Sequence, residues 1–154
     1  MFTDTAIIVR LVLSVILGGL IGFERQMNRR SAGLRTNILV CLGSCLVMLI
    51  SQYIFELYKN LVSVDPARIA ASIITGIGFL GAGAIIRERD KEVIRGLTTA
   101  ACLWVVAGIG MAVGCGFYSA ALATTALTLI VLFCLRYFEK FIFKAEKNER
   151  EGGG

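Results

Sequence analysis

The sequence predicts an all-α fold, an integral membrane bundle of five transmembrane helices, from its hydrophobicity and the spacing of its charges. Hydrophobic residues make up 56% of the 154 positions. No Asp, Glu, Lys or Arg occurs in three runs of 20, 18 and 40 residues, at 36–55, 69–86 and 96–135. A helix needs about 20 mostly apolar residues to cross the hydrocarbon layer of a bilayer. A soluble domain of this size has no interior large enough to bury so much apolar chain.

The five spans follow in order along the chain. No basic region precedes span one at 6–23 and no signal-peptidase-like site follows it, so we expect a retained helix rather than a signal peptide. Spans two and three are predicted at 37–55 and 69–86. The run of 40 residues must cross twice, because one helix of that length would be about twice too long. A break near Gly114-Cys115-Gly116 gives spans four and five at 96–114 and 117–135.

The basic residues predict the orientation and the domain organisation. Thirteen of the 16 Lys and Arg residues follow spans one, three and five, which leaves Arg10, Lys59 and Arg68 for the other side. Cytoplasmic loops are the ones enriched in Lys and Arg. We therefore expect the N-terminus outside and the C-terminus in the cytoplasm. Residues 1–136 form the predicted transmembrane domain, and 137–154 form a short basic cytoplasmic tail that lies against anionic lipid.

The glycines of span three include Gly76-Ile77-Gly78-Phe79-Leu80-Gly81, which has the G-x-G-x-x-G spacing of dinucleotide-binding loops. That motif requires a strand that turns into a helix, and an acidic residue about 20 positions later. Here the glycines lie in the middle of a span and no acid lies near position 101. A nucleotide-binding function is therefore excluded.

Helix packing gives these glycines a better explanation. Transmembrane helices associate through close contact, which small residues permit. One small-residue face of span three consists of Ala71, Thr75, Gly78 and Ala82. A second face consists of Ser72, Gly76 and Gly83, and Gly81 is a further small residue of the same span. Gly18 with Gly22, and Gly110 with Gly114, repeat the pattern in spans one and four. We expect span three to be the most tightly packed helix of the bundle or to form a dimer seam, with a substrate-lining groove as a further alternative.

Polar residues at three cytoplasmic helix ends form the candidate functional cluster. Its members are Glu24, Arg25, Arg35, Thr36, Arg95, Thr98 and Thr99. Arg binds a carboxylate with two parallel hydrogen bonds, so we expect Glu24 to pair with Arg35 or Arg25. The N-termini of spans two and four point free amide groups at the same region, which suits an anion. The cluster serves either as anchors and caps or as a ligand or partner site.

Other charged residues and the cysteines have structural interpretations. Asp65 and Pro66 are typical of a helix start, and Arg68 is expected to extend to the headgroups or to pair with Asp65. A weak external cation site at Asp65, with Glu56 and Asp4, is the alternative. Arg10 is expected to extend to the outer lipid headgroups. The five cysteines are expected to be small buried hydrophobic residues. Without histidine a zinc site is improbable, which leaves thiolate-bound copper(I) as the metal alternative. We expect no metal and no cofactor.

Three stretches together resemble the MgtC/SapB family of bacterial inner-membrane proteins. They are GGLIGFERQMNRRSAGLRTNILVCLGS (18–44), DPARIAASIITGIGFLGAGAII (65–86) and RGLTTAACLWVVAGIGMAVGCGFY (95–118). The resemblance covers about the first 135 residues and implies a location in the bacterial inner membrane. It implies a role in adaptation to low magnesium and, in pathogens, in survival inside host cells. It also implies the transmembrane domain alone, without the soluble C-terminal domain that some members carry.

The resemblance implies a regulatory protein, and we expect it to regulate or bind a partner membrane protein through its packed helices or its basic cytoplasmic face. We expect it to be non-enzymatic, because the sequence has no histidine and no recognisable nucleophile motif. A transporter or channel for Mg²⁺ or another small solute is the alternative. Cation-coupled carriers usually keep an acid within the membrane, and no Asp or Glu lies inside any predicted span. The expected partners are the lipid bilayer, a second copy in a homodimer and another membrane protein, with no nucleic acid.

Overall fold

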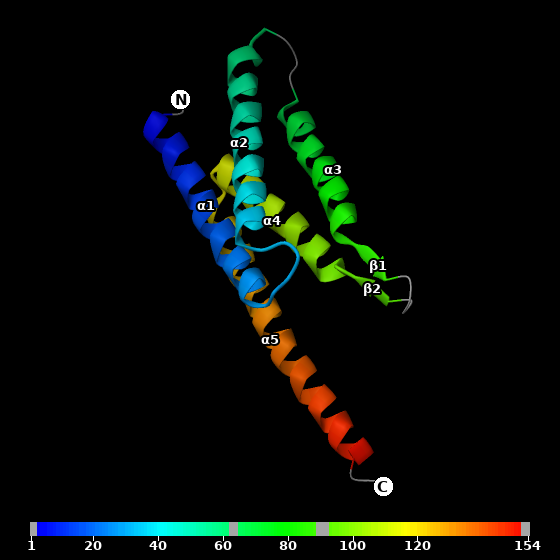
Figure 1. Ribbon diagram of the computed structural model, residues 1–154. Helices are drawn as coiled ribbons and strands as arrows, with labels where there is room; N and C mark the ends of the chain where they lie inside the picture. Colours follow the sequence, from blue (N-terminus) through cyan, green and yellow to red (C-terminus); the bar gives the residue numbers. More distant parts are fainter. Residues whose placement is uncertain (1–2, 62–64, 89–92, 152–154) are drawn as a thin grey trace.

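The computed structural model describes residues 3–61, 65–88 and 93–151, and it confirms the all-α membrane bundle (Figure 1). The helices are α1 (Asp4–Met27), α2 (Leu34–Tyr58), α3 (Pro66–Ala84), α4 (Leu97–Cys115) and α5 (Tyr118–Glu151). Each helix runs roughly opposite to the one before it, so the two ends of the chain lie at opposite ends of the bundle (Figure 1). We call the end where α1 and α3 finish and α2 and α4 begin the basic end. Its described basic side chains are Arg25, Arg29, Arg30, Arg35 and Arg95.

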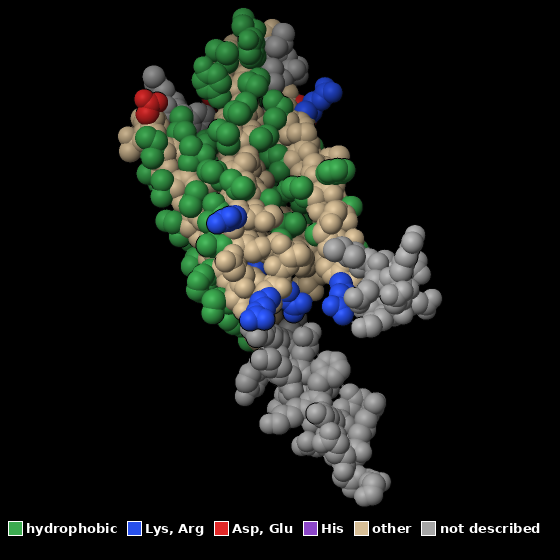
Figure 2. All heavy atoms as spheres, viewed as in Figure 1, with side chains coloured by type: hydrophobic (Ala, Val, Ile, Leu, Met, Phe, Trp, Pro, Cys, Tyr) green, Lys and Arg blue, Asp and Glu red, His purple; other side chains and the backbone are tan. Residues whose placement is uncertain are grey.

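The helices have the length and the surface of membrane spans. Helices α1, α2 and α4, and residues Ala67–Ala84 of α3, are long and apolar enough to cross a bilayer. The described apolar part of α5, Tyr118–Cys134, is shorter. Large apolar side chains are exposed along the helices, and Figure 2 shows hydrophobic residues over the flank of the bundle with Lys and Arg side chains gathered mainly at the basic end. This apolar flank fits a lipid environment rather than water.

Local sequence signals set the helix ends. The Asp65 side chain accepts a hydrogen bond of 2.8 Å from the amide of Ala67, so Asp65 caps α3, and Pro66 occupies the first helical position. Helix α4 ends at Gly116, whose φ of 80° lies in the left-handed region that glycine adopts easily. The predicted break between spans four and five is therefore confirmed. Helix α5 continues through Glu151, beyond the predicted span at 117–135, because no glycine or proline interrupts it.

A short β-hairpin joins α3 to α4 at the basic end, and the sequence analysis did not predict it. Strands β1 (Ile86–Glu88) and β2 (Val93–Arg95) pair antiparallel, with Arg87 opposite Ile94. Span three was expected to continue to residue 86, but α3 ends at Ala84. Ile86, Val93 and Ile94 are β-branched, which favours extended backbone over helix.

The core lies where α1 and α4 pack against α2. Its largest fully buried apolar side chains are Ile21 of α1, Cys41 and Cys45 of α2, and Val106, Ile109 and Val113 of α4. Glycines let the backbones approach at these two interfaces. A Cβ atom built at Gly18 would lie 2.7 Å from the Cβ of Cys41, and one at Gly110 would lie 2.2 Å from the Cys41 carbonyl oxygen. The helix contact expected at Gly22 and Gly114 is also present, with nearest atoms of α2 at 2.8 Å.

The expectation of a tightly packed span three is wrong within this chain. A Cβ atom built at Gly76, Gly78 or Gly83 would meet no described atom within 4 Å, and one at Gly81 meets only the Ala100 side chain at 3.6 Å. Helix α3 buries Ile73 and Ile77 in a second, smaller cluster with Ala107 of α4. Its small residues outnumber those of α1 and α4, but most lie on faces that no described part of this chain covers.

The cysteine expectation is partly right. Cys41, Cys45 and Cys102 are buried, whereas Cys115 and Cys134 are exposed, and all five are free thiols. Cys115 lies at the last turn of α4 and Cys134 on α5, where the described neighbours leave the flank open.

Arg10 does not extend to the headgroups as expected but turns into the bundle. Its Nη1 donates to the Gly114 carbonyl at 2.8 Å and to Gln52 Oε1 at 3.3 Å, and its Nε donates to the Tyr118 hydroxyl at 3.2 Å. Arg10 thereby joins α1 to α2, to the last turn of α4 and to the first turn of α5. A cation at a helix C-terminus is also favoured by the helix dipole.

We expect Arg10→Gln to lower the free energy of unfolding by about 1–3 kcal/mol, because it removes charge-assisted hydrogen bonds and leaves their acceptors unpaired. Arg10→Lys should restore only part of this loss, since one ammonium group cannot reproduce the fork of the guanidinium. The measurement is detergent-mediated unfolding of each variant. Full rescue by lysine would contradict the bonding role and favour a simple charge anchor.

Candidate functional site

A buried ion pair lies at the end of α1. Arg25 Nε donates to Glu24 Oε2 at 2.5 Å, and the two side chains are only 4% and 2% exposed. The other carboxylate oxygen of Glu24 accepts a short hydrogen bond from Asn28 Nδ2. Of the two expected pairings of Glu24, the one with Arg25 is therefore the one formed. Among the described residues, the exposed Arg35 makes no bond with Glu24.

Two asparagines at this end of the bundle, Asn28 and Asn37, were not among the predicted site residues. Asn37 of α2 is fully buried, and its Nδ2 donates to the carbonyls of Ala32 and Gly33, which closes the loop between α1 and α2. Arg25 Nη1, Asn28 Oδ1 and Asn37 Oδ1 are buried without a hydrogen-bond partner among the described residues. An unpaired buried polar atom costs about 1–3 kcal/mol. Asn37 could have been singled out from the sequence, because it is a strongly polar residue inside a charge-free run.

The remaining members of the predicted cluster lie in two other places at the basic end. A pocket of about 430 Å³ opens at the start of α4, lined by Arg30, Arg95, Gly96, Leu97, Thr98 and Thr99. Thr99 is buried there, whereas Thr98 and Arg95 are exposed. The first amide groups of α4 have no intrahelical acceptor, and the N-cap residue Gly96 has no side chain to cap them. We call this pocket the α4 pocket. Arg30 lines it, although Arg30 was not among the predicted site residues.

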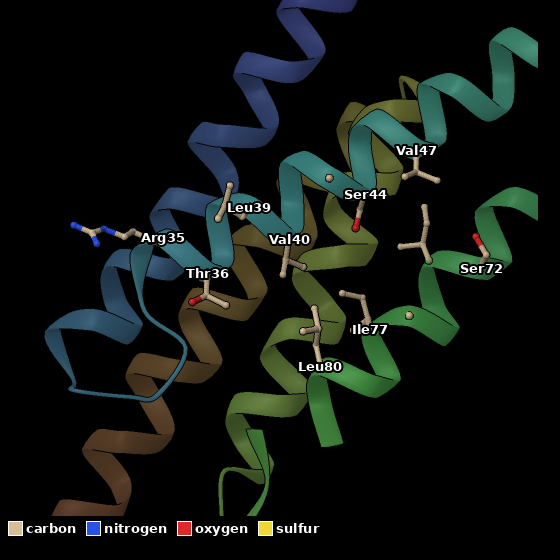
Figure 3. Close-up of a pocket in the computed structure, with 12 residues that line it drawn as sticks. Arg35, Thr36, Leu39, Val40, Ser44, Val47, Ser72, Ile77 and Leu80 are labelled. Atoms are coloured by element: carbon tan, nitrogen blue, oxygen red, sulfur yellow. The ribbon is translucent and has the colours of Figure 1, made fainter. Parts of the chain in front are cut away.

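Arg35 and Thr36 belong to a groove between α2 and α3. The groove has a volume of about 610 Å³ and contains mainly apolar or small residues, among them Val40, Gly43, Gly76 and Ile77. In Figure 3 the side chains of Val40, Ile77 and Leu80 lie between the two helices, whereas Arg35 points away from α3. The predicted cluster is thus not one site but three neighbouring features: the buried pair, the α4 pocket and the α2–α3 groove.

The opposite end of the bundle carries a helix cap and an exposed ion pair. Asp65 caps α3, and Arg68 is exposed one turn into the helix. Glu56 pairs with Lys59 at 2.7 Å. Across the residues that the structure describes, no group of three or more cysteine or carboxylate side chains is placed to hold a metal ion.

These features define a class of protein, and the sequence comparisons give the family. The fold is that of a multi-pass helical membrane protein with an apolar flank and one basic end. The sequence model of the MgtC family matches residues 11–141. The chain therefore belongs to the MgtC family, as the resemblance to MgtC/SapB proteins predicted.

Individual relatives support the same assignment. The chain is 48% identical to YhiD of Escherichia coli over 127 residues, which cover 81% of this chain and 58% of YhiD. It is 39% identical to SapB of Bacillus subtilis over 132 residues, covering 84% of this chain and 56% of SapB. It is 48% identical to MgtC of Salmonella typhimurium over 130 residues, covering 84% and 52%. The chain thus spans a little over half the length of these relatives. No solved structure matches it.

Proposed function

We propose that the chain is a non-enzymatic protein of the bacterial inner membrane that supports adaptation to low magnesium by binding and regulating a partner membrane protein. The names of its relatives support the link to magnesium, since the E. coli relative YhiD is provisionally named as a magnesium transporter. We place the partner contact at the basic end, where Arg30 and Arg95 line the α4 pocket and where polar atoms of Arg25 and Asn28 have no hydrogen-bond partner among the described residues.

One observation favours a regulator over a carrier. The carboxylate of Glu24 is the buried acid of the described bundle, and both of its oxygens are already bonded within the chain, to Arg25 and Asn28. Such a carboxylate is poorly placed to exchange protons or to receive a cation from solvent. A transporter or channel for Mg²⁺ or another small solute remains the second candidate because of the name given to YhiD.

We further propose a homodimer whose seam is the exposed small-residue face of α3. The residues of this face are Ala71, Thr75, Gly78 and Ala82, and all four are exposed. Small residues let two transmembrane helices approach closely, and twofold pairing is the commonest assembly. The mass of the protein released from native lipid measures this directly, and a monomer would contradict it.

Flux measurements separate the two candidate functions. Purified protein in liposomes should pass no Mg²⁺, K⁺ or H⁺ above the rate of empty liposomes, because a regulator without its partner moves no solute. A flux that is abolished by Glu24→Ala or Arg35→Ala would defeat the regulatory proposal. Glu56→Ala, which alters only an exposed pair, serves as the matched control.

A further inference from the structure

The α4 pocket and the α2–α3 groove lie along one path. Thr36 and Leu80 line the groove, and both also line a small intermediate pocket of about 360 Å³ towards the basic end. That intermediate pocket includes Ser31, the neighbour of Arg30, and Ala84. The carbonyl of Ala84 lies against Gly96 of the α4 pocket, where a Cβ atom would be 2.0 Å from the oxygen. A polar, cationic pocket therefore lies next to the apolar groove and its intermediate pocket, with the backbone contact of Ala84 and Gly96 between them.

The groove has the length of one leaflet. Its lining on α2 runs from Arg35 to Val47, which is about 18 Å at the helical rise per residue. The hydrocarbon core of a bilayer is about 30 Å thick, so one leaflet contributes about half of that. A partner transmembrane helix would need the full thickness, whereas one acyl chain needs only this depth. The small residues Gly43 and Gly76 leave the groove open between α2 and α3.

The α4 pocket is lined by groups that suit the binding of a phosphate group. Arg30 and Arg95 supply guanidinium groups, which bind phosphate oxygens with paired hydrogen bonds. The uncapped amide groups at the start of α4 add positive partial charge, and Thr98 adds a hydroxyl donor. The pocket lies at the end of the bundle where lipid headgroups meet water.

We propose that an anionic phospholipid binds along this path, with its phosphate in the α4 pocket and one acyl chain in the α2–α3 groove. The proposal goes beyond the regulatory function above and does not depend on it. The lipid fills the space that α3 leaves beside α2, and it makes the position of α3 sensitive to the lipid composition of the membrane.

Lipid retention tests the headgroup contact. The full chain is purified from membranes that contain phosphatidylglycerol and phosphatidylcholine with the same acyl chains, and bound lipid is measured by native mass spectrometry. Phosphatidylglycerol should be retained in preference to phosphatidylcholine. Arg30→Gln should weaken that retention about fivefold, the effect of one basic residue at an anionic lipid surface. Arg29→Gln is the matched control, because the exposed neighbour Arg29 lines none of the three cavities.

A second pair of variants tests the groove. Gly76→Leu places a side chain into the groove and should remove retention of the lipid, whereas Gly108→Leu, in equally open space on α4 and outside the three cavities, should not. Equal retention of the two lipids, or equal effects within either variant pair, would overturn the proposal. Binding of inorganic phosphate without phosphatidylglycerol would assign the pocket to a free anion instead. A lipid-free dimer that Gly76→Leu disrupts would assign the groove to a second copy.

Discussion

Gly110→Leu is expected to lower the free energy of unfolding by about 3 kcal/mol, the upper range for overpacking a tightly packed interface. The nearest atom to a Cβ at Gly110 is the Cys41 carbonyl oxygen at 2.2 Å, and Ser44 Cβ follows at 3.0 Å. A backbone oxygen cannot rotate away as a side chain can. Helices α2 and α4 must therefore separate, and they would lose the close contact that holds transmembrane helices together.

Gly108→Leu provides the control for this experiment. Gly108 lies half a turn away on the same helix, and a Cβ there meets no described atom within 4 Å. Both variants are unfolded by titration of a denaturing detergent into mild micelles, with protease resistance as the measure of folded protein. Equal loss of stability in the two variants would mean that α4 does not pack on α2 through Gly110.

Glu24→Ala is expected to cost about 3–5 kcal/mol, because it leaves the Arg25 guanidinium buried without its counter-charge. The pair is almost completely shielded, with side chains 4% and 2% exposed. Glu56→Ala breaks a pair of similar length whose side chains are 42% and 49% exposed, and it should change the free energy of unfolding far less, because water screens an exposed pair. Detergent-mediated unfolding of the two variants gives the comparison.

The double variant Glu24→Ala with Arg25→Leu tests the cause of this loss. Removing both charges also removes the uncompensated guanidinium, so the double variant should be more stable than Glu24→Ala alone. A double variant whose loss equals the sum of the two single losses would show that the charges act independently, which the 2.5 Å contact does not allow.

The number of helices and the close contact at two interfaces could be predicted because each has a strong local signal. Charge-free runs correspond to the helices, and Gly116 marks the break between α4 and α5. Gly18 with Gly22, and Gly110 with Gly114, are spaced four residues apart, so each pair presents one continuous small surface to α2. That spacing identified the real interfaces.

The packing of α3 and the roles of Arg10 and Asn37 could not be predicted, because they depend on which helices become neighbours in the fold. Span three was expected to pack most tightly because of its two small-residue faces, yet Gly76 and Gly78 point to open space. Glycine content shows that a close approach is allowed but does not name the partner. Arg10 could be placed near the outer surface from its position, but its bond to the Gly114 carbonyl required the tertiary fold. The same holds for Asn37, whose role depends on the loop beside it.

The central claim is that α1 and α4 are held to α2 by backbone contact at glycines, while the exposed face of α3 stays free within one chain. A leucine scan of the helical glycines in a detergent that keeps the protein monomeric tests this claim most directly. Leucine at Gly18, Gly22, Gly110 and Gly114 should greatly reduce the fraction of folded protein, and leucine at Gly76, Gly78 and Gly83 should leave it close to the wild-type value. If leucine at Gly76 and Gly78 is as damaging as at Gly110, α3 is packed inside the bundle and the account is wrong.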